Sequence, residues 1–410
     1  MRAPTPQQIV DRFSRLPLRT KLLGVIGVLA LPILTLVAFQ VSRDLDAVNS
    51  NQAALDGLQY IDNGPVVLLK DVQRHRLQTA LVASGDSSAK AALAEAADAV
   101  ERDLAAIAKT EGATAKFGAS STVAIIRDQW GLLKAAGDTA SADAVIAAHN
   151  RLVDEGIIPL IFAAGNSSKL FQLGDLDAQN TVMGITQGLI LETEAESRAG
   201  AYGVVAIRTR TAGQPASPLL RGELTAELLE VKTSEAATHR WLAGASAANE
   251  EYARKVDPLL KAAEAAAGTF TANVLSLAGD SPQEITTADF LKSLTGTSDA
   301  NTALYVGAES VVRSDLKAGI SGAWTNLLVT LGAGLGALAV ATFLAVMIAR
   351  SITGPIERLV VAADRMSLGE LDLTIPAGGA REVRRLAESL ARMQLSLRSA
   401  IERLRARRAA

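Results

Sequence analysis

The chain has 410 residues, of which 49% are hydrophobic and 4% aromatic, and its net charge is -2. This near-neutral balance gives no general attraction to nucleic acid, and the absence of Cys excludes disulfides and thiolate metal sites. With three His and no HExxH, GxxxxGK[ST] or GxSxG pattern, the sequence offers no zinc, nucleotide or acyl-transfer site. We therefore expect no enzyme, metal or cofactor. Few aromatic residues and many Ala, Leu, Glu and Arg favour long helices, so we predict an all-α fold.

Two hydrophobic runs are long enough to cross a membrane. The first, Leu22 to Val41, follows a basic segment at 1–21, and the second runs from Trp324 to Ala349 within 323–349. About 20 apolar residues span a bilayer core. A cleaved signal peptide is the alternative for the first run, but the run is longer than an h-region and no A-x-A cleavage pattern follows it. The flanking basic residues predict a multi-pass protein of the cell membrane, with both termini cytoplasmic and 42–322 outside.

The outer region, 42–322, has the pattern of helices separated by short breakers. A first set is predicted at 43–63, 66–84, 87–110, 120–136 and 141–171, the last kinked near Pro159. A second set is predicted at 177–211, 218–244 and 247–277, followed by a short helix from Ser281 to Gly296 and a final helix from Asp299 into the second span. Antiparallel helices of this length favour two stacked four-helix bundles.

The helix at 66–84 carries the feature that most needs explaining. Its apolar face collects Leu68, Leu69, Val72, Thr79, Ala80 and Ala83. Arg76 falls in the middle of that face, His75 at its edge and Arg74 away from it. An unpaired guanidinium in an apolar seam keeps its desolvation cost, so Arg76 needs a partner. Its planar fork suits an oxyanion, either a carboxylate of the protein or a small external anion.

A second Arg stands among apolar residues in the second set. Aligning Arg198 with Arg76 places it beside Leu191, Ala195, Tyr202 and Val205. The two sets are therefore either an old duplication or a chance likeness between Ala-rich helices. We expect Arg198 to be structural.

The segment after the second span contains two amphipathic helices joined by a connector. The first has Pro355, Ile356, Leu359, Val360, Ala363 and Met366, and the second has Val383, Leu386, Leu390, Met393, Leu397 and Ile401 near heptad spacing. Two such seams need a second chain to cover them, so we predict a homodimer in which they form a parallel four-helix coiled coil.

This segment, predicted at 350–404 before a basic tail at 405–410, resembles the HAMP signal relay. The resemblance is carried by Pro355, by the Gly-Glu-Leu-Asp-Leu connector at 369–373, and by Glu382 at the start of the second helix. The chain departs from the usual HAMP pattern at Arg381, where an acidic residue is usual, and at Ala391, where Asn is common.

The outer region resembles the nitrate- and nitrite-sensing (NIT) family of bacterial receptors. Gln73-Arg74-His75-Arg76 and the following LVASG carry the likeness, with His75 replacing the usual Glu and Leu77 replacing the usual Gly. The whole chain resembles the input half of actinobacterial NIT-HAMP sensor proteins. The resemblance implies nitrate or nitrite as the ligand, Arg76 as its main contact, and Arg74, Gln73 and His75 as further candidates.

These expectations combine into one functional hypothesis with two alternatives. The chain is predicted to be a homodimeric transmembrane receptor for a small anion, relaying its signal to a cytoplasmic partner such as a histidine kinase. The first alternative is the input part of a sensor kinase whose catalytic domain is absent or lies on a partner. The second is a structural membrane protein that spaces its partners apart.

Overall fold

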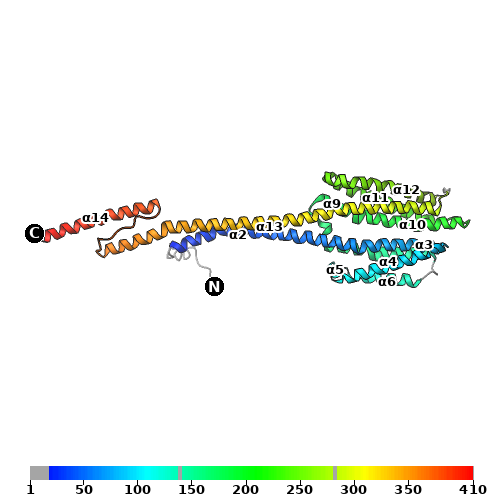
Figure 1. Cartoon of the computed structure of the whole chain (residues 1–410), viewed down its shortest axis with the longest axis horizontal. Coiled ribbons are helices and arrows are strands. Elements are labelled where there is room, and N and C mark those ends of the chain that lie inside the picture. Colours follow the sequence, from blue (N-terminus) through cyan, green and yellow to red (C-terminus); the bar gives the residue numbers. More distant parts are fainter. Residues whose placement is uncertain (1–17, 137–140, 280–283, 410) are drawn as a thin grey trace, which may run out of the picture. The chain divides into compact units, whose positions relative to one another are not determined.

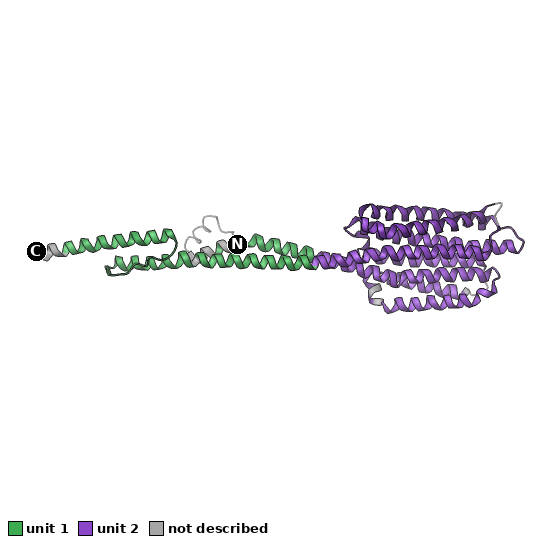
Figure 2. Cartoon of the chain, turned by 45° about the horizontal axis from the view of Figure 1, so that its top comes forward, with its two compact units in different colours: residues 1–45, 324–410 green, residues 46–323 purple. Residues whose placement is uncertain are grey.

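A computed structural model describes residues 18–136, 141–279 and 284–409. The basic segment before Leu18, and the helix start predicted at Ser281-Pro282, lie outside these ranges. Within them the chain is almost entirely helical and contains no strand, which confirms the all-α prediction. The chain divides into unit 1 (1–45 and 324–410) and unit 2 (46–323), shown in Figure 2.

The elements of the first half of unit 2 include a helix at each predicted position, with small shifts of the ends, and a short helix at Glu111–Lys116 that was not predicted (Figure 1). They are α2 (Leu18–Asn63, of which the unit takes the part from Asp46), α3 (Pro65–Ala83), η1 (Ser87–Ala89), α4 (Lys90–Lys109), α5 (Glu111–Lys116), α6 (Ser120–Ala136), α7 (Ala142–Leu152), a π-helical turn η3 (Val153–Ile157), α8 (Ile158–Ser167) and η4 (Leu170–Gln172). Pro65 opens α3, and Gly85, with φ +92°, follows its end. The Ser141 hydroxyl caps α7 by accepting from the Ala144 N–H at 3.3 Å.

The second half differs from the prediction at three places. It consists of α9 (Leu176–Met183), a π-helical turn η5 (Gly184–Leu189), α10 (Ile190–Thr211), α11 (Pro218–Ala248), α12 (Glu250–Ala278) and the start of α13 (Thr287–Ser367). The helix expected over 177–211 is widened at η5, and the helix predicted to end at Gly244 continues to Ala248. The break expected at Gly296 is absent, because one Gly weakens a helix without ending it when neighbouring residues pack.

Two clusters of buried apolar side chains form the core of unit 2, and each draws on both halves of the sequence. One joins Leu58 and Leu160 to Leu242 and Leu304, and the other joins Ala80 to Phe270. Figure 2 shows the helices of this unit running alongside one another. The two predicted sets therefore share their cores rather than enclosing one each, which differs from two independent bundles.

Unit 1 contains the start of α2, the rest of α13 and α14 (Arg381–Ala409). Among the described residues, α13 is the one helix long and apolar enough to cross a membrane, with a mean hydropathy of 2.2 in a window of which none is buried. It contains the predicted span 323–349. The described part of α2 is not identified as a second such helix, and several of its early side chains lie outside the description, so the span at Leu22 to Val41 stays a prediction.

Candidate functional site

The buried face of α3 is largely the one that the sequence predicted. Leu68, Leu69, Val72 and Ala80 are buried, and Arg76 is fully buried among them. Ala83, expected on this face, is exposed at the last turn of the helix. Arg74 points away, is 44% exposed, and pairs with Glu95 of α4 at 3.0 Å.

Arg76 has an internal carboxylate partner, Glu194 of α10. Its Nη1 donates to Glu194 Oε1 at 2.6 Å and its Nη2 donates to Oε2 at 3.0 Å. Nη1 also donates to the Asn150 side-chain oxygen of α7 at 2.9 Å. This two-point pairing is the geometry in which a guanidinium and a carboxylate bind most strongly. Of the two partners left open by the sequence, the described structure contains the carboxylate.

Further donors surround Glu194. Gln73 Nε2 donates to its Oε2 at 3.0 Å, and Arg198 Nε, one turn along α10, donates to its Oε1 at 2.7 Å. Arg198 also pairs with Asp154 of η3. Burial raises the pKa of the Glu194 carboxyl, but the charges and hydrogen bonds of Arg76, Arg198 and Gln73 outweigh burial and hold the pKa below its ordinary value. Glu194 is therefore an ionised carboxylate held by donors from α3 and from α10 itself.

His75 belongs to a second buried contact, next to this network. Its Nδ1 lies 2.7 Å from Nε2 of His149 on α7, and its ring meets the edge of Trp130 on α6 with centroids 4.9 Å apart. His149 Nδ1 lies 2.7 Å from the Val145 carbonyl, an acceptor, so this nitrogen carries the proton. Burial lowers the pKa of His149 to about 3 and that of His75 to about 4, so both rings are neutral near pH 7. His75 Nδ1 must then donate to His149, which leaves His75 Nε2 as an acceptor.

Two more glutamates of α10 are buried beside Glu194. The Glu192 carboxylate accepts from the Thr238 hydroxyl of α11 at 2.8 Å, and Glu196 accepts from Asn301 Nδ2 of α13 at 2.8 Å. Burial raises the pKa of Glu192 to about 7. Burial, with the nearby Glu192 charge, raises the pKa of Glu196 well above its ordinary value. In the described residues no group of three or more His, Cys, Asp or Glu side chains is arranged to hold a metal ion.

The four candidate residues therefore lie in three different environments. Gln73 and Arg76 converge on Glu194, His75 faces His149, and Arg74 lies on the surface. The sequence reading missed Glu194, Asn150 and His149. One signal was present: Glu192, Glu194 and Glu196 stand at alternate positions of one helix, so they lie on different faces and cannot all turn toward water.

The burial of Arg76 also bears on the predicted homodimer, because an anion could link two chains only if it reached an Arg76 of each. In the described structure Arg76 is enclosed by α7 and α10 of its own chain, with none of its surface exposed. A second chain has no access to this guanidinium in this arrangement.

The segment after the span forms two helices joined by a connector. The Ala380 N–H donates to the Ser351 carbonyl at 3.1 Å, which places the start of α14 beside α13. Gln394 Nε2 donates to the carbonyls of Leu371 and Leu373 at 2.8 Å and 2.7 Å, and so fixes the connector along α14. The two helices therefore run in the same direction. Leu359, Val383 and Ala387 pack between them, whereas Leu386 and Met393 are each 50% exposed in the single chain.

Residues 347–399 match the HAMP domain family, and the predicted relay at 350–404 overlaps nearly all of this match. No curated protein matches the chain. No solved structure matches it either. The chain thus contains a HAMP domain, the signal relay of membrane sensor proteins, and this indicates a sensor that transmits a signal.

Proposed function

We propose that this chain is a receptor of the cell membrane in which unit 2 binds a small anion and the HAMP domain relays the event. The observation that carries the proposal is the order along α13: residues of the unit 2 core, then the apolar stretch, then the HAMP match at 347–399. The exposed apolar side chains of this stretch, including Leu328, Leu335 and Phe343, suit contact with lipid.

In the proposed topology unit 2 is extracytoplasmic, Leu22 to Val41 is the first of two spans, and both termini are cytoplasmic. Described side chains of that run, such as Val28, Leu36 and Phe39, are exposed and apolar, as a lipid-facing helix requires. The exposed Leu386 and Met393 support a homodimer, in which a second copy covers them. The proposed output is a cytoplasmic signalling partner such as a histidine kinase. The role proposed for these residues is to receive the signal and relay it, without catalysis.

Nitrate or nitrite is the proposed ligand, and Arg76 is its proposed contact. The guanidinium is already organised for a planar oxyanion, because Glu194 occupies it in two-point fashion. An entering anion would exchange with Glu194, and the displaced carboxylate would keep Arg198 and Gln73 as partners. Such an exchange would replace a link between α3 and α10. It would therefore favour a different packing of the two helices only to the extent of the ligand's differential affinity.

Exchange predicts that Glu194 competes with the ligand. Glu194→Gln removes the competing charge while keeping the side-chain volume, so nitrate should bind at least about tenfold more tightly than to the unsubstituted chain. Glu196→Gln is the matched control, since Glu196 lies one half-turn along α10 and bonds to Asn301 instead of an arginine. Isothermal titration of the full chain in nanodiscs measures both.

Two outcomes would contradict the proposal. Nitrate affinity that is unchanged or weaker in Glu194→Gln would remove Arg76 as the contact. If neither nitrate nor nitrite binds any of the three proteins or raises its melting temperature, the spacer alternative is favoured over this receptor.

A further inference from the structure

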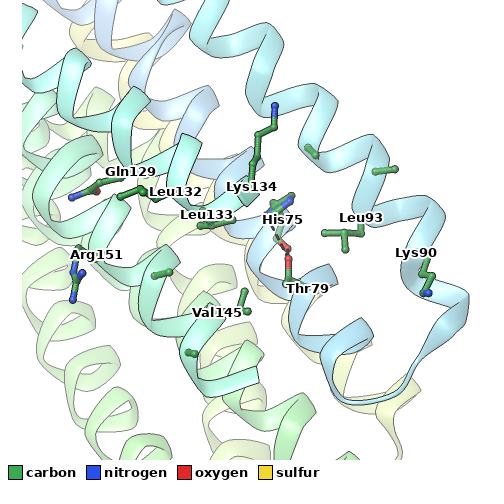
Figure 3. A pocket seen from close by; sticks show the side chains of 14 residues that line it. His75, Thr79, Lys90, Leu93, Gln129, Leu132, Leu133, Lys134, Val145 and Arg151 are labelled. Carbon is green, nitrogen blue, oxygen red and sulfur yellow. Dashed lines mark hydrogen bonds between the residues drawn. The ribbon is translucent and has the colours of Figure 1, made fainter. Parts of the chain in front are cut away.

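A cavity lies beside His75, among α3, α4, α6 and α7. Its volume is about 520 Å³, within the range of about 300–1,000 Å³ that is usual for small-molecule sites. His75 and Thr79 of α3 contribute to its lining, together with Leu93, Leu133, Val145 and Ala148 (Figure 3). The cavity thus lies within unit 2, between four helices.

The charged side chains lining this cavity are all basic. They are Lys90 of α4, Lys134 of α6 and Arg151 just after Asn150 on α7, and no carboxylate is among the lining residues. Lys134 also pairs with Glu101 at 2.6 Å, and Arg151 lies 3.9 Å from Glu155. Lys90 makes no ion pair within the described part of the chain. Three cations around an apolar cavity favour a ligand that is negative at one end and apolar elsewhere.

His75 and Thr79 form the polar part of the inner wall. His75 is 7% exposed and uses Nδ1 for His149, so its Nε2 remains an acceptor without a hydrogen bond among the described residues. The Thr79 hydroxyl beside it donates to the His75 carbonyl at 2.7 Å. A ligand in the cavity would therefore contact the residue that precedes Arg76 in α3.

We propose that this cavity is a second ligand site, which binds a small organic monocarboxylate with an apolar body. The body packs on Leu93, Leu133 and Val145, and the carboxylate meets one of the two rim cations, Lys90 or Arg151, which lie at opposite ends of the cavity (Figure 3). Nitrate has no apolar body to fill such a space, so this site is distinct from the one proposed at Arg76. It gives unit 2 an organic-acid input that acts on α3 at His75, the residue next to Arg76. The proposal goes beyond nitrate sensing and does not depend on it.

Charge reversal at the rim is the first test. The probe is 1-naphthoate, with benzoate as a smaller acid and 1-naphthylmethylamine as a cation of similar shape, each dialysed to equilibrium against the full chain in nanodiscs. We expect one 1-naphthoate per chain, weaker benzoate binding and no binding of the amine. Lys90→Glu combined with Arg151→Glu should weaken 1-naphthoate at least about tenfold. The control reverses two exposed cations outside the cavity, Lys109→Glu of α4 with Arg127→Glu of α6, and should leave binding unchanged.

Filling the cavity is the second test. Ala148 lines it and Ala147 is exposed beside it on α7, so Ala148→Leu should abolish 1-naphthoate binding and Ala147→Leu should not. Circular dichroism measures whether each variant keeps its helix content. If Ala148→Leu does not fold, the rim variants alone test the proposal. The proposal is wrong if neither acid binds, if the amine binds equally well, or if neither the rim reversal nor Ala148→Leu weakens binding. Nitrate titration of Ala148→Leu keeps the two ligands apart, because nitrate binding should persist there even when 1-naphthoate binding is lost.

Discussion

At the scale of single residues, the centre of unit 2 is an arginine held by a carboxylate and not by solvent. Arg76 and Glu194 are buried on facing helices, and removing either one leaves the other with the desolvation cost of a buried charge and one ion-pair partner fewer. Arg198 and Gln73 reduce this cost for Glu194, but Arg76 has only Asn150 as a further partner among the described residues.

The pair makes a prediction about stability. Arg76→Ala should lower the free energy of unfolding by about 3 kcal/mol, the lower part of the range for breaking a buried pair, because Glu194 keeps two other donors. Arg76→Met combined with Glu194→Met should recover most of that loss, since apolar side chains of similar volume need no partner. Arg74→Ala, which breaks an exposed pair, should cost less than about 1 kcal/mol. Denaturant unfolding followed by tryptophan fluorescence measures all three, and a double variant no more stable than Arg76→Ala would show that the pair is not the cause.

The buried glutamates predict a dependence of stability on pH. Burial raises the pKa of Glu192 to about 7 from an ordinary value of 4.5. The folded state therefore holds this proton more tightly. The resulting stabilisation is complete below pH 4.5 and is lost as pH rises through 7, and it amounts to at most about 3 kcal/mol at about 1.4 kcal/mol per pKa unit. His75 and His149, whose pKa values burial lowers to about 4 and 3, contribute in the opposite sense: stability present above pH 6.5 is lost as pH falls.

Glu192→Gln isolates the carboxyl contribution from the histidines. The variant should melt near the unsubstituted chain at pH 5 and several degrees above it at pH 8, because the amide never acquires the buried charge. Glu230→Gln, on the exposed face of α11, should leave the melting temperature nearly unchanged at both pH values. An equal difference for Glu192→Gln at pH 5 and pH 8 would contradict the assignment.

At the scale of elements, the sequence predicted those helix ends that depend on the chemistry of neighbouring residues. Pro65 and Gly85 bound α3 because one presets φ for a first turn and the other adopts positive φ, and the hydroxyl of Ser141 caps α7. The π-helical turns η3 and η5 were not predicted, because they depend on packing between helices. At Gly188 of η5 a Cβ would lie 2.7 Å from the Thr238 Cα, so α11 approaches closely enough for Thr238 to reach Glu192.

The same limit applies to the candidate site. The pattern of α3 showed that Arg76 needs a partner, but the partner lies 118 residues away on α10, and no local rule pairs these two positions. The helical period alone correctly predicted that Arg74, which shares the motif with Arg76, lies away from the buried face. His75 was expected at the edge of the face, and its burial depends on His149 and Trp130, which are also distant in sequence.

The HAMP helices give a prediction at the same scale. Leu386 is 50% exposed in a single chain and lies in the heptad seam, so Leu386→Asp should be tolerated within one chain but should place a carboxylate between the chains of a dimer. We expect this variant to lose ligand-dependent signalling while nitrate titration of unit 2 changes less than about twofold. Glu388→Asp, at an exposed position one half-turn away, serves as the control. Equal loss of binding and signalling in Leu386→Asp would show that the relay is not a separate module.

At the scale of the whole molecule, the proposed topology places unit 2 outside the cell and the HAMP domain inside. The chain has no Cys, so a single engineered thiol reports its own location. Ser217→Cys, in the turn before α11, should react with an impermeant maleimide on intact cells, and Ser389→Cys of α14 should react only after lysis. The reverse pattern, or protection of both thiols in intact cells, would overturn the topology.

The central claim is that ligand binding in unit 2 changes the packing of the HAMP domain. Leu386→Cys in the otherwise Cys-free chain, reconstituted in vesicles, allows this to be measured as the rate of disulfide formation between two copies. We predict that saturating nitrate changes this rate several-fold, and that Glu194→Gln reaches the same change at lower nitrate concentration. A rate that is identical with and without nitrate, in a preparation shown by titration to bind it, would contradict the account.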